Sequence, residues 1–357
     1  MRFGMVVTPT DTLGTSDADL YGELIADATL GHQLGFESAW FIEHHFTDYY
    51  PVPSPFVFMG HVAAKCPGMG LGTCVSVTPW HNPIRFAEEI AMLSILSSGH
   101  LHIGMGRGTA ALEYEAMGID MGQSREMFAE SWEITRRFIA GEAFAFDGQF
   151  TKIGRVVQAR PRARQDNVSF YGALSSPATA LILGGLGLAP LCAAAFPLGL
   201  QAKTLEKWRV AAEAGPGTNV GTRPVMVNCF LADTDAQARD LSRRYTPLYY
   251  RQQIEHYEIE TTDWSKIRGY ETYQKAFDSF RQMAQPENLD PWMDLQMIGS
   301  AETVAERIAQ YRDAGFNKII VHCATPGIPR AVRHDTLRRF ARDVAPRFAD
   351  IQLKAAS

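Results

Sequence analysis

Short apolar runs rich in β-branched and aromatic residues alternate with longer amphipathic runs along almost the whole chain. The first kind is typical of buried strands, and the second predicts helices that bury one face. Strands are expected at 2–7, 38–43, 70–77, 100–105, 168–173, 190–195, 224–232 and 319–323. Helices are expected at 17–34, 54–65, 83–96, 124–140, 177–186, 204–214, 234–250, 301–314 and 329–348. This alternation predicts an α/β protein, a (β/α)8 TIM barrel with insertions.

The domain organisation follows from the same pattern. No linker rich in proline, serine or charge divides the 357 residues, so we expect one barrel domain over 1–357. Residues 144–153 predict a hairpin with a type I′ turn at Asp147-Gly148. Residues 251–300 break the βα spacing and are rich in aromatic side chains, which predicts an insertion over one mouth of the barrel. This insertion is either an active-site lid or a dimer contact or surface loop.

Residues 167–202 contain no charged residue and no histidine, and a membrane span needs about 20 apolar residues. Prolines and glycines cut this stretch into pieces of strand or short-helix length, so we interpret it as a buried strand, helix and strand. The chain starts directly in a strand-like segment without a signal-peptide pattern, which predicts a cytoplasmic protein.

Charge and cysteine content exclude several function classes. The net charge of −5 and the pI of about 6.1 argue against a partner such as nucleic acid or an anionic membrane. The five cysteines are scattered and form no C-x-x-C pair, so neither disulfides nor a structural zinc site is expected.

Active sites of such barrels lie at the carboxyl ends of the strands, which draws attention to Glu43-His44-His45. Carboxylate and imidazole groups suit divalent metals, but consecutive residues leaving a strand project to opposite faces, so we expect no metal there. Two interpretations stay open. The residues form a structural hydrogen-bonding pair, or one histidine acts at a cofactor or as an acid or base.

Three features could hold a phosphate. The glycine-rich turn 104–108 lets the backbone approach a ligand, and its Arg107 offers a planar fork. Arg125 stands at the start of a helix, where a cation does not help the helix dipole; it either meets an anion or pairs with Glu126 or Glu130. Ser176 before Pro177 predicts a helix start that binds phosphate or is simply capped.

The order and spacing of several motifs resemble the bacterial-luciferase-like flavin monooxygenases. The resemblance is dense over about residues 1–140, returns at 175–179, and is seen again at 299–304 and Gly315. It is carried by Gly35-Phe36 to Trp40, Glu43-His44-His45-Phe46-Thr47, Gly72-Thr73 to Thr78-Pro79, His81-Asn82-Pro83, Ala87-Glu88, Leu93 to His100, Gly104 to Gly108, Gly118 to Asp120 and Ser124-Arg125.

The resemblance implies a barrel that forms a homodimer and uses O2 with reduced FMN supplied by a separate flavin reductase. Arg107, Arg125, Ser176, Thr179 and the backbone of Ser175 would hold the FMN phosphate. Cys74, Val75 and Gly106 would lie at the flavin ring, with a non-prolyl cis peptide between Cys74 and Val75. His44 would act as acid or base while a flavin C4a-peroxide reacts, and His45 would be structural.

Departures from the light-emitting pattern bear on the substrate. Gly106 replaces a cysteine, Ser175 replaces a glutamate, and Ala194 lies where luciferases are aromatic. The resemblance therefore implies an oxygenase for a small organic compound, by Baeyer–Villiger oxidation or hydroxylation. Alternatives are a deazaflavin (F420)-dependent oxidoreductase, an alkanal luciferase proper, and a non-catalytic flavin-binding protein.

Overall fold

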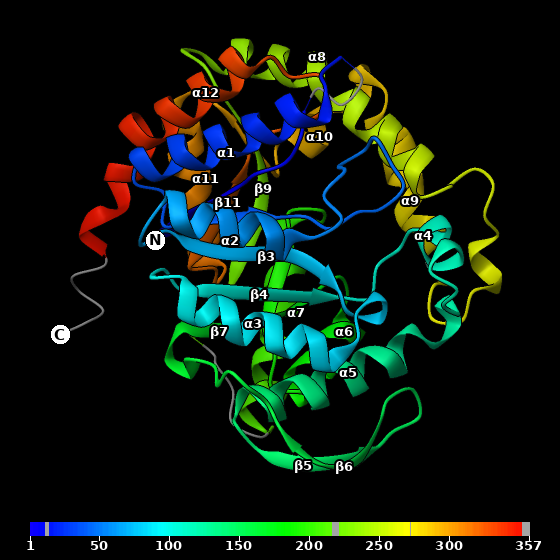
Figure 1. The fold of residues 1–357 in the computed structure, drawn as a ribbon. Coiled ribbons are helices and arrows are strands. Elements are labelled where there is room, and N and C mark those ends of the chain that lie inside the picture. The colour runs from blue at the N-terminus through cyan, green and yellow to red at the C-terminus, as the bar shows by residue number, and fades with distance from the viewer. Residues whose placement is uncertain (11–13, 216–220, 272, 352–357) are drawn as a thin grey trace.

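Eight parallel strands close into a barrel at the centre of the molecule (Figure 1). The computed structural model describes residues 1–10, 14–215, 221–271 and 273–351. The barrel closes because β9 pairs with both β8 and β11, and β11 pairs with β1. The predicted barrel and its eight strands are confirmed. In barrel order they are β1 (Arg2–Val6), β2 (Ser38–Phe41), β3 (Gly70–Val77), β4 (Leu101–Gly106), β7 (Val168–Ala173), β8 (Ala189–Ala193), β9 (Pro224–Leu231) and β11 (Lys318–His322).

Helices surround the barrel, and each of the predicted helices is present (Figure 1). They are α1 (Asp17–Gln33), α2 (Pro55–Lys65), α3 (Pro83–Leu96), α5 (Ser124–Ile139), α6 (Pro177–Gly185), α7 (Leu198–Glu213), α8 (Asp235–His256), α11 (Ala301–Asp313) and α12 (Arg330–Arg339). The starts of α1, α3 and α8 are fixed by Ser16, Asn82 and Thr234, whose side chains accept backbone N–H groups of the first turn. The uncharged stretch 167–202 forms β7, α6 and β8, as predicted.

Apolar side chains fill two layers. One cluster lies within the barrel and includes Trp40, Tyr171 and Ile320, while a much larger one joins the outer faces of the strands to the helices. At the amino end of β11, the buried ammonium group of Lys318 lies 3.2 Å from Glu37 and 3.1 Å from His102. Burial lowers the pKa of Lys318 to about 8.

The hairpin forms, but its predicted turn is wrong. Strands β5 (Ala143–Asp147) and β6 (Lys152–Gln158) are joined by a four-residue loop over 148–151, because Asp147 still pairs in the ladder. Gly148 lacks the positive φ that a type I′ turn requires. The Glu130 carboxylate of α5 accepts N–H groups from three residues of this loop and holds it instead.

Several boundaries also differ from the prediction. Helix α7 begins at Leu198 rather than at 204, and α8 continues past 250 to His256. The short helices α4 (Ala111–Ala116), α9 (Tyr273–Met283) and α10 (Asp290–Met293) and the short strand β10 (Met297–Gly299), which extends the sheet beside β9, were not predicted. The extension of α8 and the presence of α4 matter most, because both bring side chains into the site described below.

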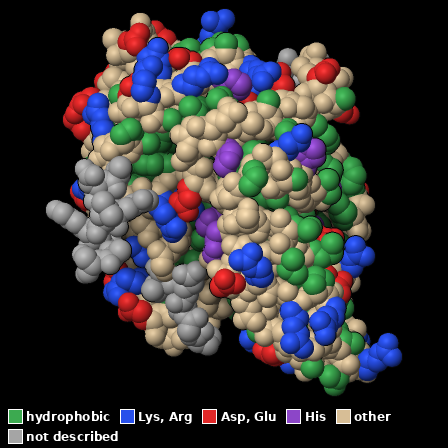
Figure 2. Space-filling view, turned by 60° about the vertical axis from the view of Figure 1, so that its left-hand side comes forward, with side chains coloured by type: hydrophobic (Ala, Val, Ile, Leu, Met, Phe, Trp, Pro, Cys, Tyr) green, Lys and Arg blue, Asp and Glu red, His purple; other side chains and the backbone are tan. Residues whose placement is uncertain are grey.

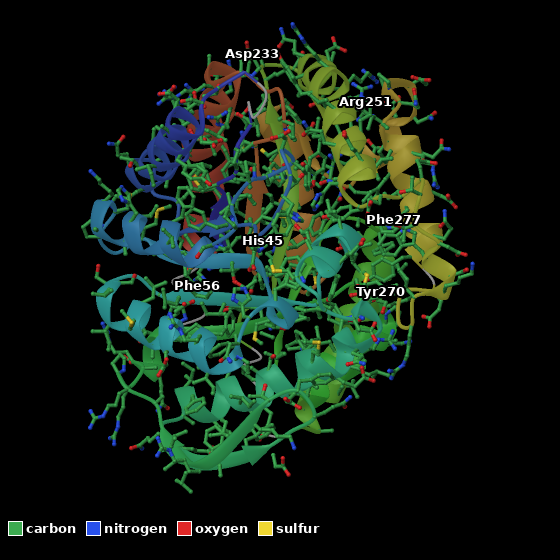
Figure 3. All side chains as sticks on the ribbon, turned by 45° about the vertical axis from the view of Figure 1, so that its right-hand side comes forward. His45, Phe56, Asp233, Arg251, Tyr270 and Phe277 are labelled. Atoms are coloured by element: carbon green, nitrogen blue, oxygen red, sulfur yellow. The ribbon has the colours of Figure 1, made fainter. Side chains whose placement is uncertain are left out.

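The segment 251–300 lies at the carboxyl ends of the strands. In Figure 1 the arrowheads of β3 and β4 point towards α4 and α9, and Figure 3 shows Tyr270 and Phe277 on that side of the molecule. Tyr270, Phe277 and Trp264 pack against Tyr114 of α4 and Trp80 after β3. The segment therefore covers the connections that follow β3 and β4.

The surface carries charges of both signs. Figure 2 shows acidic and basic side chains interspersed on the face that it presents, in line with the small net charge of −5. Within the described part of the chain, we find no helix that combines the length and the apolar character needed to cross a membrane.

Candidate functional site

The predicted site residues follow strands that are neighbours in the barrel. Strands β2, β3, β4 and β7 pair in parallel one after the other, so the segments that follow them leave the barrel at the same end. This end carries His44 after β2, Cys74 and Val75 within β3, Gly106 and Arg107 at the end of β4, and Ser175 and Ser176 after β7.

The peptide between Cys74 and Val75 is cis, as the resemblance implied. It lies where the ladder between β3 and β4 shifts its register, between Thr73 and Ser76. The side chain of Val75 occupies the space that a Cβ atom at Gly106 would need. Residue 106 therefore has no room for a side chain, which explains why glycine stands there.

Two guanidinium groups meet beside Gly269. An ideal Cβ at Gly269 would lie 3.0 Å from Nε of Arg125 and 3.5 Å from Nη1 of Arg107. Arg107 donates to the Ser124 hydroxyl at 3.3 Å and lies 4.6 Å from the centre of the Tyr270 ring, while Arg125 donates to the Gly269 carbonyl at 3.3 Å. Neither arginine lies within ion-pair distance of a carboxylate among the described residues, although backbone hydrogen bonds and, to a smaller extent, the charge of Arg125 lower the pKa of Glu126 and Glu271. Two adjacent guanidinium groups can bind an anion between them.

The alternative partners suggested for Arg125 are engaged elsewhere. Glu126 forms an ion pair with Arg268, and Glu130 holds the hairpin loop. The interpretation of Arg125 as a surface cation paired with one of these carboxylates is therefore wrong.

The start of α6 is capped as predicted. The Ser176 hydroxyl accepts the N–H of Thr179 at 3.2 Å, and the two hydroxyl oxygens are 2.9 Å apart. A cavity of about 200 Å³ opens beside this helix end and has a mostly apolar lining, typical of sites that bury the body of a small ligand. Its walls are formed by Leu174, Ser175, Ser176, Pro177, Cys192, Ala193, Phe196, Leu200, Gln201 and Thr204.

His44 belongs to a buried cluster with Glu113 and His256. Its Nδ1 atom lies 3.3 Å from Oε1 of Glu113 and 3.0 Å from Nε2 of His256, and the latter two atoms are 3.5 Å apart. Oε1 of Glu113 also accepts the backbone N–H of His45 at 2.6 Å. Burial, reinforced by the neighbouring His44, lowers the pKa of His256 to about 2, so its imidazole is neutral.

Glu43 projects into a different cluster, as the alternation of side chains predicted. Its Oε1 atom meets Nε2 of His81 at 2.8 Å and Nε2 of His45 at 3.3 Å, and its Oε2 accepts the N–H of Val77 at 3.1 Å. Burial alone would raise the pKa of Glu43, but hydrogen bonds from both histidines outweigh it and lower this pKa. Burial opposes the charged form of His81 too, yet the hydrogen bond to Glu43 raises its pKa.

Sequence reasoning missed two members of the His44 cluster. Glu113 lies on a helix of only six residues that carries no clear periodic pattern. His256 is the last residue of α8, beyond the predicted end of that helix. A signal for His256 does exist, because Thr246, Tyr249, Tyr250, Gln253 and His256 are all buried and recur at helical spacing.

The fold and the residues at this end define a (β/α)8-barrel protein that carries two adjacent arginines, a capped helix start and a buried cluster of two histidines and a glutamate where the strands end. Residues 1–318 match the family described as luciferase-like monooxygenase, and the chain belongs to this family. The flavin-dependent trigonelline monooxygenase, oxygenase component, of Acinetobacter baylyi is 30% identical over 160 residues, which cover 44% of each chain. The alkanal monooxygenase alpha chain of Aliivibrio fischeri is 22% identical over 97% of this chain and 98% of that one. Two curated relatives with 30–33% identity are matched over only 39–44% of their own length.

Solved structures share the fold. The monooxygenase RslO1 from Streptomyces bottropensis has a TM-score of 0.82 at 24% identity, covering 98% of this chain and all of that one. The oxygenating constituent of 3,6-diketocamphane monooxygenase from Pseudomonas putida, a type II Baeyer–Villiger monooxygenase in complex with FMN, has a TM-score of 0.74 at 21% identity, covering 97% and 98%. The coenzyme F420-dependent tetrahydromethanopterin reductase of Methanopyrus kandleri has a TM-score of 0.68 at 15% identity, covering 97% and 99%. At these identities the likeness concerns the fold alone.

Proposed function

We propose that the protein is the oxygenase component of a two-component, FMN-dependent monooxygenase. It would take reduced FMN from a separate flavin reductase and use it with O2 to oxygenate a small organic substrate, by Baeyer–Villiger oxidation or hydroxylation. The observation that carries the proposal is the pair of adjacent guanidinium groups of Arg107 and Arg125 at the carboxyl end of the barrel. Family membership and a relative named as an oxygenase component support it.

The residues present fit a phosphorylated flavin. Arg107 and Arg125 supply positive charge, and Ser176 and Thr179 supply hydroxyl groups at a helix start, with the backbone of Ser175 beside them. The partly buried side chain of Val75, which packs against the backbone of Gly106, offers an apolar contact for the flat ring system. FMN, when bound in its reduced form, supplies the electrons for O2 activation.

His44 is the proposed acid and base. Nδ1 of His44 faces Glu113 and His256, so its Nε2 is the nitrogen that can exchange a proton with the substrate. Glu113 also accepts the N–H of His45, which fixes the carboxylate and through it the orientation of the His44 ring. These contacts hold the imidazole in one orientation before a substrate arrives.

The insertion 251–300 is proposed as a lid of the single barrel domain, which spans 1–357. Its Tyr270 hydroxyl donates to the Gly108 carbonyl at 2.8 Å and lies 3.2 Å from the Ser124 hydroxyl. Trp264, Tyr273 and Phe277 pack around Tyr270, and Tyr257 lies near His44. Such a cover would keep bulk water away from the reacting groups.

Assembly and location are part of the same proposal. We infer a homodimer in the cytoplasm. The dimer is suggested by α3, which leaves Met92, Ile95 and Leu96 exposed by 50%, 47% and 69%, so that a second copy could cover them. Light scattering on the purified protein gives the mass in solution, and a monomer at micromolar concentration would contradict the dimer.

The test of the proposed function is anaerobic titration with reduced FMN and, in parallel, with reduced F420. We expect reduced FMN to bind and to be oxidised after a pulse of O2, with one atom of ¹⁸O2 entering a product when a panel of ketones and aromatic compounds is supplied. Preferential binding of F420 without O2 uptake would establish the deazaflavin alternative. FMN binding without labelled product across the panel would favour a non-catalytic flavin-binding protein, and light emission with decanal would identify a luciferase.

A further inference from the structure

Three buried side chains from distant parts of the chain point their ligand atoms at one another. His44 follows β2, Glu113 lies on α4, and His256 ends α8. Their exposed fractions are 8%, 0% and 5%. Nδ1 of His44, Oε1 of Glu113 and Nε2 of His256 form a triangle with sides of 3.0, 3.3 and 3.5 Å. They are the one group of this kind that the described residues bring together.

We propose that this triangle is a binding site for one divalent first-row transition-metal ion, with zinc as its representative. Ligand atoms at 2.0–2.1 Å from a tetrahedral ion are about 3.3 Å apart, which matches the three sides. Two imidazoles and one carboxylate form a ligand set known for zinc, with a fourth position left for water or substrate. The expectation of no metal concerned a site made of Glu43, His44 and His45. In the structure, Glu113 and His256 lie beside His44 in the places considered for Glu43 and His45.

Hydrogen bonding alone does not complete this cluster. Three acceptor-capable atoms face one another, and each neutral imidazole carries a single N–H. Oε2 of Glu113 and Nδ1 of His256 are buried without a hydrogen-bond partner. No lysine or arginine of the described chain forms an ion pair with Glu113, whose only ion-pair partners are His44 and His256. A cation at the centre of the triangle would compensate the buried carboxylate.

A bound ion would have two consequences. It would tie the end of α8, and with it the start of the segment 251–300, to β2 and α4. It would also occupy Nδ1 of His44 and fix the tautomer in which Nε2 carries the proton, so that Nε2 acts as a hydrogen-bond donor to the reacting molecule. The second consequence rests on the proposed role of His44 in oxygenation, whereas metal binding itself does not.

The experiment is a metal titration of the full-length protein after dialysis against a chelator. Calorimetry with Zn²⁺ should show one ion bound per chain, and Co²⁺ should give the visible absorption of a tetrahedral site. Glu113→Gln and His256→Gln, which nearly preserve side-chain size, should each weaken Zn²⁺ binding by at least about 100-fold, because loss of an outer-shell partner alone costs 10–100-fold. Circular dichroism verifies that each variant is folded.

His81→Gln is the matched control, because it removes a partly buried histidine from the neighbouring Glu43 cluster. It should keep both the stoichiometry and the affinity for Zn²⁺. Absence of stoichiometric binding to the wild-type protein, or binding that survives both Glu113→Gln and His256→Gln, would overturn the proposal. Titration of the wild-type protein with reduced FMN separates the two hypotheses, since absence of Zn²⁺ binding together with intact FMN binding would contradict the metal site and leave the proposed function standing.

Discussion

Two clusters of one glutamate and two histidines begin at adjacent residues of the same strand end, yet they differ in how their polar atoms are satisfied. Around Glu43, both carboxylate oxygens have partners, in His45, His81 and the backbone of Val77. Around Glu113, one carboxylate oxygen and one nitrogen of His256 are buried without a partner. The two clusters have the same composition, but the histidines of the Glu43 cluster are only partly buried and its carboxylate is fully engaged, whereas the Glu113 cluster is buried and keeps unengaged atoms.

The difference separates a structural cluster from a functional one. A buried carboxylate with all of its acceptors engaged stabilises the connections that it joins, here the segments after β2 and β3. A buried group with unengaged atoms lowers stability, and such groups are found where a ligand or a reacting molecule completes the site. The Glu43 cluster should therefore matter for folding, and the Glu113 cluster for chemistry.

The largest effect should follow from His44→Ala. Loss of the acid and base should lower product formation about 10²–10⁴-fold, because that is the usual contribution of a positioned proton-transfer group. Binding of reduced FMN should stay within a few-fold of the wild type, because none of the proposed phosphate ligands is changed. Product formation under saturating reduced FMN and O2 measures the first effect, and anaerobic titration measures the second.

His45→Ala is the matched change in the structural cluster. It removes one of two histidine partners of Glu43 and leaves the backbone N–H that Glu113 accepts. The purified, folded variant should turn over much closer to the wild-type rate than His44→Ala does. Equal losses of turnover in the two variants would contradict the structural role assigned to the Glu43 cluster and the catalytic role assigned to the Glu113 cluster.

The next largest effect should follow from removing either of the two adjacent arginines at the carboxyl end of the barrel. Arg107→Ala and Arg125→Ala should each weaken binding of reduced FMN by about 10- to 100-fold, since a hydrogen bond to a charged group contributes about 1.5–3 kcal/mol. Riboflavin, which lacks the phosphate, should bind the variants and the wild type alike. If both variants lost riboflavin and FMN affinity equally, the arginines would not be phosphate ligands.

Most of the fold could be predicted from the sequence because the strands and helices of a barrel repeat a simple local pattern. Alternating runs place the strands to within a few residues, and side chains such as Ser16 and Asn82 mark helix starts. The turn at Gly148 was mispredicted because Glu130, which is distant in sequence, holds a longer loop. Local propensity does not contain such a tertiary contact.

The candidate site was predictable where it follows a strand or begins a helix. His44, Arg107 and Ser176 stand at strand ends, a position that the barrel rule identifies, and Arg125 stands at a helix start. Glu113 and His256 lie 69 and 212 residues from His44 along the chain. Helical spacing extends α8 as far as His256, but only the three-dimensional arrangement of α4 and α8 shows that Glu113 and His256 meet His44.

Glu43→Gln should reduce stability rather than activity. It removes the charge that two partly buried histidines and one backbone N–H share, and an unsatisfied buried group costs about 1–3 kcal/mol. Urea denaturation should show a decrease of this size in the free energy of unfolding, while the affinity for reduced FMN stays unchanged. A Glu43→Gln variant as stable as the wild type would remove the structural role assigned to this cluster.

The smallest expected effect is a change of the free energy of unfolding with pH, which arises from the titration of His81 and Glu43. The pKa of His81 is raised above its usual 6.5 in the folded protein, because the hydrogen bond to Glu43 outweighs the opposing effect of burial. Its contribution to stability is therefore complete below about pH 6.5 and is lost as the pH rises through the folded pKa. The pKa of Glu43 is lowered from 4.5, so its contribution is present above that pH and is lost as the pH falls through the folded value.

Urea denaturation between pH 6 and pH 8 isolates the histidine part of this dependence. The wild type should lose unfolding free energy over this range relative to His81→Gln, in which the titrating group is absent. In Glu43→Gln this decrease of the unfolding free energy with pH should also be absent, because the carboxylate that raises the pKa of His81 is gone. If the slope persisted in both variants, it would arise from groups outside this cluster, and the coupling inferred between Glu43 and His81 would be wrong.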